Sequence, residues 1–197
     1  MNPAASTTDC GLPGIRSIPY GMHMCHFYSD REELAATLVP YFAAGLRNNE
    51  RCIWITAEPL SATDAKEALV RHDPAATAAL RAESLIVRDH SDWYENADGL
   101  QGKQVIELWL AEEERARKAG YSGLRITGNV TFLTPQTWDL FMEYEEALTA
   151  ALANRRIVAL CSYHLQRSSW TDLLDVSRRH HCTLDRPDQG WQILTGR

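Results

Sequence analysis

Short apolar runs alternate with longer stretches of helical periodicity over most of this chain. The apolar runs are residues 23–28, 51–56, 85–87, 124–127 and 156–163. The helical stretches are residues 29–48, 59–72, 75–82, 101–119, 134–154 and 170–180. Because parallel strands are joined by crossover connections, this alternation predicts an α/β fold: a three-layer sandwich with a mostly parallel central sheet.

Three further segments add detail to this predicted fold. Residues 156–163 form the most apolar run, so we expect them at the centre of the sheet. Residues 182–194 hold two strand-like pieces around a turn rich in Asp, Pro and Gly, which predicts an antiparallel edge hairpin at the C-terminus. We expect one domain over residues 20–197, preceded by a flexible N-terminal arm over residues 1–19.

Composition excludes several classes of protein. A net charge of −6 argues against direct contact with nucleic acid, which needs a basic surface. No run approaches the roughly 18 apolar residues of a membrane span, and the first 20 residues lack the pattern of a secretion signal. The five cysteines are scattered without a CxxC motif. We therefore expect a cytoplasmic protein with reduced thiols.

Six blocks of sequence between Gly21 and Trp191 are distinctive in combination. They are Gly21–Tyr28, Leu38–Phe42, Gly45–Glu50, Cys52–Leu60, Gly123–Asn129 and Leu160–Tyr163. This combination resembles the MEDS family, the sensory domain of the DcmR type from methanogens and methylotrophs.

The resemblance implies a RecA- or KaiC-like fold that has lost its phosphate loop. It also implies a sensory domain for small molecules, in some members small hydrocarbon derivatives such as halomethanes. Such domains act in signal transduction and transcription regulation, usually beside a DNA-binding helix-turn-helix or a histidine kinase. Since the resemblance spans almost the whole chain, we expect the signal to pass to a separate regulator or histidine kinase.

The turn after the first strand agrees with the loss of nucleotide binding. A phosphate loop has the pattern GxxxxGK[ST], but residues 29–33 here read Ser-Asp-Arg-Glu-Glu, which is acidic where phosphate would lie. Ser29 is expected to cap the helix that follows. No GxSxG or HExxH motif is present, so we do not expect an enzyme.

We expect a small apolar or metabolite ligand at the carboxyl ends of the strands, where open α/β sheets bind their ligands. Aromatic side chains near these ends would form the walls, and polar ones would orient the ligand. The expected ligand-binding residues are Tyr28, Trp54, Trp93, Tyr94, Arg125, Asn129, Tyr163 and His164. The simpler alternative is that most of these aromatics are core residues, which is the better interpretation for Trp109.

A second hypothesis is a metal-, haem- or thiol-redox-sensing domain. His23 and Cys25 are two residues apart in a strand, so they share a face with Cα atoms about 6.6 Å apart. Cys161 would join them if its strand is a neighbour, with His180 or His181 as a fourth group. Such a set suits Zn or Cu, or could supply a haem axial ligand. The alternative is that these are ordinary buried residues.

Other possibilities remain open at this stage. Cys25 and Cys161 would form a disulfide on oxidation if their Cα atoms lie within about 7 Å. The chain could also be a ligand-free protein-interaction module. The leading hypothesis needs no cofactor, and a homodimer is plausible because most soluble oligomers are two-fold.

Overall fold

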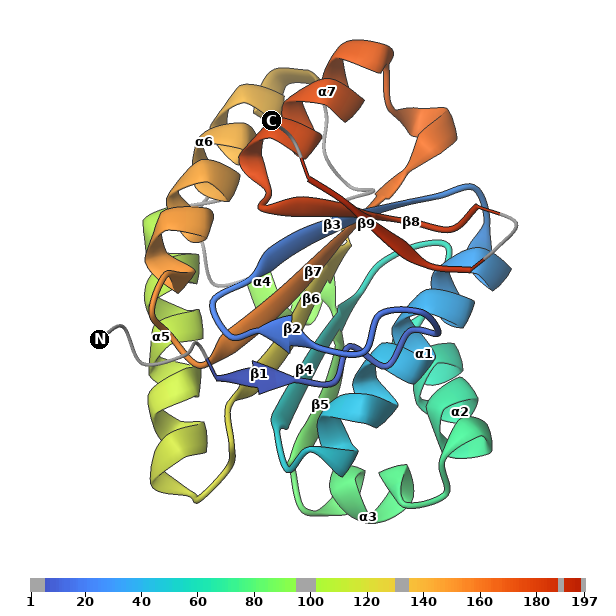
Figure 1. Ribbon diagram of the computed structural model, residues 1–197, viewed down its shortest axis with the longest axis vertical. Helices are drawn as coiled ribbons and strands as arrows, with labels where there is room; N and C mark the ends of the chain where they lie inside the picture. Colours follow the sequence, from blue (N-terminus) through green and yellow to red (C-terminus); the bar gives the residue numbers. More distant parts are fainter. Residues whose placement is uncertain (1–5, 95–101, 130–134, 188–189, 196–197) are drawn as a thin grey trace.

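The computed structural model describes residues 6–94, 102–129, 135–187 and 190–195. Its centre is a seven-stranded sheet in the order β5-β4-β6-β7-β3-β8-β9, with helices on both faces (Figure 1). The strands are β3 His23–Tyr28, β4 Arg51–Thr56, β5 Leu85–Asp89, β6 Leu124–Asn129, β7 Ile157–His164, β8 Cys182–Asp185 and β9 Gln192–Leu194. All neighbours are parallel except β8 and β9. The expected parallel sheet and closing hairpin are both confirmed.

The most apolar strand lies at the centre of the sheet, as its composition predicted. Strand β7 is fourth in the order, and its first seven residues are buried. It pairs with β6 on one side and β3 on the other. The second pairing places Cys161 directly beside Cys25 in the register.

Helices cover both faces of the sheet. The helices are α1 Arg31–Arg47, α2 Ala62–His72, α3 Ala76–Arg81, α4 His90–Tyr94, α5 Gly102–Lys118, α6 Pro135–Leu152 and α7 Trp170–Arg179, with a 3-10 turn η1 Leu165–Arg167. Buried side chains of α1, α2 and α3 pack on one side, which we call the α1 face. Those of α5, α6 and α7 pack on the other, the α6 face. Among the described residues, no helix combines the length and apolar character that a membrane span requires.

Helix α1 begins one residue later than its sequence suggested. Asp30, not Ser29, is the cap, and its carboxylate accepts a hydrogen bond from the backbone N–H of Glu33 at 2.8 Å. Glu33 in turn accepts from the Ser29 N–H at 2.8 Å. The acidic turn thus satisfies its own free amides, which are the groups that bind phosphate in a phosphate loop.

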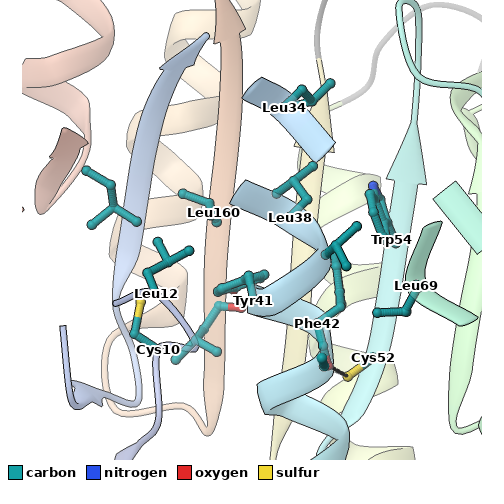
Figure 2. Close-up of a cluster of buried hydrophobic side chains, with 14 of the residues drawn as sticks. Cys10, Leu12, Leu34, Leu38, Tyr41, Phe42, Cys52, Trp54, Leu69 and Leu160 are labelled. Atoms are coloured by element: carbon teal, nitrogen blue, oxygen red, sulfur yellow. Dashed lines mark hydrogen bonds between the residues drawn. The ribbon is translucent and has the colours of Figure 1, made fainter. Parts of the chain in front are cut away.

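The N-terminal segment contributes side chains to the core. Composition suggested a flexible arm over residues 1–19, but over residues 6–19 the chain forms the small sheet of β1 Thr7–Thr8 and β2 Ile18–Pro19. Cys10 and Leu12 are buried in the same cluster as Tyr41 and Leu160 on the α1 face (Figure 2). Over its described part, the segment therefore packs on the sheet.

Candidate functional site

Four buried polar side chains meet on the α6 face of the sheet. They come from β3, α6, β7 and the residue after α7, and we call them the His–Glu–Cys cluster: His23, Glu145, Cys161 and His180. Their nitrogen, oxygen and sulfur atoms all lie within 4.8 Å of one another, and no member is more than 6% exposed. His23 Nε2 lies 3.3 Å from Cys161 Sγ. Glu145 Oε2 lies 3.2 Å from both His23 Nε2 and His180 Nε2.

Ordinary periodicities bring these residues together. Alternation along β3 and β7 places His23 and Cys161 on the same side of the sheet. In α6, Glu145 falls between Phe141 and Leu148, so helical spacing turns its carboxylate inward with them. His180 ends α7 and packs its ring 4.0 Å from that of His23, centroid to centroid.

Neighbouring groups fix which nitrogen of each histidine carries the proton. The Thr149 hydroxyl donates to the Arg179 carbonyl at 2.6 Å, so its oxygen can only accept from His23 Nδ1, 2.7 Å away. His180 Nδ1 lies 2.8 Å from the Val176 carbonyl oxygen, which also only accepts. Both Nδ1 atoms are therefore donors. Whenever such a ring is neutral, its Nε2 presents a lone pair to the centre of the cluster.

Burial sets the charges of the cluster. It lowers the pKa of His23 to about 4, so this ring is neutral at pH 7. Burial also raises the pKa of the Cys161 thiol. At neutral pH His23 is therefore a neutral imidazole and Cys161 a thiol.

The structure selects among the metal ligands that the sequence suggested. His23 and Cys161 belong to the cluster, but the Cys25 thiol lies 3.2 Å from Thr183 Oγ1, outside it. His181 also lies outside, because its Nδ1 accepts a hydrogen bond from the His23 backbone N–H at 3.0 Å. Sequence reasoning missed Glu145, although a carboxylate at an inward position of a predicted helix was the available signal.

The residues expected to bind a small molecule are divided between the two faces. Tyr28, Trp54, Arg125, Asn129 and His164 belong to the α1 face. Trp93 and Tyr163 belong to the α6 face, where Trp93 stacks on Trp109 at 5.1 Å. The Tyr94 side chain lies outside the described residues. Tyr28 and Tyr163 therefore do not line a common pocket.

Three of these residues do meet at the carboxyl ends of the strands. The Tyr28 hydroxyl donates to Asn129 Oδ1 at 3.3 Å, and the His164 ring lies edge-on to Tyr28 with centroids 5.1 Å apart. Two others lie deeper in the fold. Trp54 is 1% exposed and stacks on Phe42 with centroids 4.8 Å apart (Figure 2).

Arg125 is the other deep residue, and its guanidinium is fully occupied. Its Nε donates to Glu50 Oε2 at 2.6 Å, and its Nη atoms donate to the carbonyls of Asp9 at 2.7 Å and Tyr41 at 2.8 Å. Arg125 is the second residue of β6, so it lies toward the amino end of the sheet. The structure does not bring it to the edge where the ligand was expected.

A cavity of about 470 Å³ lies at the carboxyl ends of β3 and β8. Its wall includes His26 and Phe27 of β3, Leu165 of η1, and Leu184 and Asp185 of β8. Of the residues that the sequence suggested for ligand binding, none whose side chain the structure describes lines this cavity.

His26 also has a fixed tautomer. The Thr37 hydroxyl donates to the Glu33 carbonyl at 2.9 Å, so its oxygen accepts from His26 Nε2, 3.3 Å away. Burial lowers the pKa of His26 to about 4, which leaves a neutral ring at pH 7. Its Nδ1 is therefore a hydrogen-bond acceptor, and it has no partner among the described residues.

The parallel sheet, its two helical layers and the acidic turn in place of a phosphate loop define a RecA-like domain without the nucleotide motif. The flagellar accessory protein FlaH from Methanocaldococcus jannaschii has a similar fold, with a TM-score of 0.59 over 90% of this chain and 80% of that chain, at 12% sequence identity. The chain belongs to the MEDS family, the "MEthanogen/methylotroph, DcmR Sensory domain", whose model matches residues 22–181. No curated protein matches it in sequence. The resemblance inferred from the sequence blocks is confirmed, and the chain belongs to a family of sensory domains.

Proposed function

We propose that this chain is a cytoplasmic signal-input domain that binds a small organic ligand in the cavity at the carboxyl ends of β3 and β8. It then passes the signal to a separate regulator or histidine kinase. Membership of a sensory family supports the general role. The cavity volume of about 470 Å³ falls within the 300–1,000 Å³ typical of small-molecule sites.

The buried acceptor of His26 carries this proposal. Its Nδ1 has no hydrogen-bond partner among the described residues, and the side chain is 1% exposed. A buried polar atom without a partner costs about 1–3 kcal/mol. A ligand with an O–H or N–H group in the cavity would donate to Nδ1 and remove that cost.

The other residues that line the cavity indicate the chemical character of the rest of the ligand. Phe27, Leu165 and Leu184 offer apolar surface, while Asp185 and Arg186 add charged groups. This combination suits a small molecule with an apolar body and one donor group. Since Glu33 of α1 and Ser177 of α7 also line the cavity, a bound ligand would contact both helical layers.

Calorimetric titration with short-chain primary alcohols and the corresponding chloroalkanes tests the proposal. The two series share an apolar body, but only the alcohols donate a hydrogen bond. We expect the alcohols to bind about tenfold more tightly, which corresponds to one hydrogen bond of about 1.4 kcal/mol. Equal affinity for both series would show that the His26 acceptor does not recognise the ligand.

A matched pair of variants locates the binding site. Leu165→Trp places a large ring at the cavity wall, whereas Leu174→Trp makes the same change on α7 at a position that does not line the cavity. Leu165 and Leu174 are 37% and 54% exposed, so neither change burdens the core. We expect alcohol binding to be lost only in Leu165→Trp. Equal binding by the two variants, or no binding by the unmodified chain, would refute the proposal.

A further inference from the structure

We propose that the His–Glu–Cys cluster is a tetrahedral metal site for a zinc-type divalent ion. The ligands are His23 Nε2, His180 Nε2, one carboxylate oxygen of Glu145 and Cys161 Sγ. The proposal stands on the α6 face and does not depend on the cavity at the carboxyl ends of β3 and β8.

The four ligand atoms have nearly the spacing of a tetrahedral zinc site. Zinc binds nitrogen and oxygen at about 2.0–2.2 Å and sulfur at about 2.3 Å, so tetrahedral ligand atoms lie roughly 3.3–3.6 Å from one another. The observed separations are 3.2 Å from Glu145 Oε2 to each histidine Nε2 and 3.3 Å from His23 Nε2 to Cys161 Sγ. All the ligand atoms lie within 4.8 Å of one another, so small side-chain movements would complete the geometry.

Glu145 faces one nitrogen from each of two histidine rings whose other nitrogen is already a donor. Both Nδ1 atoms donate, His23 to Thr149 and His180 to the Val176 carbonyl, so Nε2 is the atom of each ring that is left to coordinate an ion. Neither carboxylate oxygen of Glu145, nor His180 Nε2, has a hydrogen-bond partner among the described residues. A cation at the centre would convert these close approaches of lone pairs into coordination bonds.

The outer contacts are those of a metal site. Histidine ligands of metals usually donate their second ring N–H to a carbonyl, carboxylate or other oxygen, which fixes the ring and its tautomer. Thr149 and the Val176 carbonyl serve His23 and His180 in this way. The Thr149 oxygen is itself held by its bond to the Arg179 carbonyl.

Charge also favours an ion in the cluster. Glu145 is fully buried, and neither of its carboxylate oxygens has a hydrogen-bond partner among the described residues, which is costly. On binding Zn²⁺, the Cys161 S–H bond would break, its proton would pass to solvent, and an S–Zn bond would form. The ion's two positive charges would then balance one carboxylate and one thiolate, so the buried set would be neutral.

The ligand set also narrows the choice of metal. Two imidazoles, one carboxylate and one thiolate are typical zinc ligands, whereas Cu(I) prefers more sulfur. The cavity beside Glu145 and Cys161, as the described residues outline it, measures about 20 Å³. Neither His23 nor His180 lines this cavity, and its volume is far too small for a haem.

Cobalt(II) is a suitable probe because tetrahedral cobalt and a cobalt–thiolate bond both give characteristic absorption. The full chain, freed of metal by chelator, would be titrated with Co²⁺ and then with Zn²⁺. We expect one equivalent of cobalt, intense visible bands, a thiolate charge-transfer band, and displacement of all of these by zinc. A chain that stays folded by circular dichroism and takes up no cobalt, or binds it without the thiolate band, would overturn the proposal.

Two cysteine variants assign the sulfur ligand. Cys161→Ser removes the proposed ligand, and Cys25→Ser removes its buried neighbour in the register, whose thiol contacts Thr183 instead. We expect the charge-transfer band to disappear in Cys161→Ser and to persist in Cys25→Ser. The opposite result, or no difference between the two, would contradict the ligand set.

Thr149→Val tests the outer contact without touching a ligand. Loss of such a contact typically weakens metal affinity 10- to 100-fold. We expect cobalt affinity to fall by that factor while the stoichiometry and the thiolate band are kept. Unchanged affinity in a folded variant would contradict the assigned His23 tautomer. The alcohol titrations of the other cavity report separately, so failure of either proposal leaves the other test intact.

Discussion

Two buried ionic clusters lie on opposite faces of the sheet, and they are satisfied to different degrees. On the α1 face, the Arg125 guanidinium pairs with Glu50 and donates to backbone carbonyls, and Tyr20 donates to the second Glu50 oxygen at 2.6 Å. In the His–Glu–Cys cluster on the α6 face, ligand atoms converge with no hydrogen bond to Glu145 among the described residues. The first is a structural contact in which every charged group is paired, and the second is the set of side chains that we propose as metal ligands.

The packing around Arg125 supports the structural interpretation. A Cβ atom on Gly45 of α1 would lie 2.7 Å from Arg125 Cδ and Nε and 2.8 Å from the Cys52 sulfur. Only glycine lets the helix approach the guanidinium this closely. Residues 8–10 close the other side, where Thr8 accepts from Arg125 Nη2 at 3.3 Å. Arg125 thus joins the N-terminal segment to the sheet.

The largest expected loss of stability comes from breaking the buried ion pair between Arg125 and Glu50. Arg125→Met keeps much of the side-chain length but leaves Glu50 buried and unpaired. We expect the free energy of unfolding to fall by about 3–5 kcal/mol, as measured by urea denaturation. Arg71→Met is the control, because its pair with Glu67 is exposed and worth less than about 1 kcal/mol. Similar losses in the two variants would remove the distinction between a buried and a surface pair.

Zinc should stabilise the folded chain only through the His–Glu–Cys cluster. At a free zinc concentration 100 times the dissociation constant, we expect the free energy of unfolding to rise by about 2.7 kcal/mol, less any binding to the unfolded chain. Urea denaturation with zinc and with chelator measures the difference. The gain should vanish in Cys161→Ser and persist in Cys25→Ser. An equal gain in both variants would place the zinc elsewhere.

Acid should weaken the histidine cluster in the absence of metal. Burial lowers the pKa of His23 from 6.5 to about 4, so below pH 6.5 the unfolded chain binds a proton that the folded chain excludes. Stability therefore falls as the pH drops from about 6.5 to about 4, by about 2 kcal/mol between pH 7 and pH 5 for this residue.

Urea denaturation in chelator at pH 7 and pH 5 measures this effect. His23→Gln should lose less stability over the interval than the unmodified chain does. Arg125 keeps its charge throughout, because Glu50 and Tyr41 outweigh burial and raise its pKa further. The same pH dependence with and without His23 would show that this imidazole is not the group excluded from protonation.

Two tyrosine variants give the smallest expected effects. Tyr20→Phe removes a hydrogen bond to Glu50, and we expect a loss of about 1.5 kcal/mol. The Tyr163 hydroxyl is buried beside the other cluster without a partner among the described residues, so Tyr163→Phe removes an unsatisfied group and should raise stability by about 1 kcal/mol. Calorimetric melting in chelator compares them. Equal losses would mean that the two clusters are equally satisfied.

Much of the candidate metal site was within reach of the sequence, but its completion was not. Strand alternation placed His23 on the same face as Cys25, and the apolar character of β7 suggested Cys161 as a neighbour. Glu145 lies on α6 and His180 directly follows α7, and no spacing rule relates either residue to His23, more than a hundred positions away. The sequence could therefore offer His180 only as an alternative to His181, and it gave no reason to choose Glu145. Their approach depends on how α6 and α7 pack on the sheet.

The predicted ligand residues show a similar limit. Neighbouring strand residues such as Tyr163 and His164 point to opposite faces, so a set chosen for its aromatic and polar character was divided by the sheet. Arg125 had the charge expected of a ligand-orienting residue, but it is the second residue of β6 and so lies far from the carboxyl end of the strand. There the N-terminal segment packs against it and supplies buried hydrogen-bond acceptors such as the Asp9 carbonyl.

The sequence by itself determined the parallel sheet, its central strand, the closing hairpin and the family, because these follow from local periodicity and contiguous blocks. Only the tertiary structure decided which buried polar groups find partners. Hydrogen bonds and ligand sets depend on atoms a few ångströms apart, and residues distant in the chain reach such separations only when helices and strands pack together.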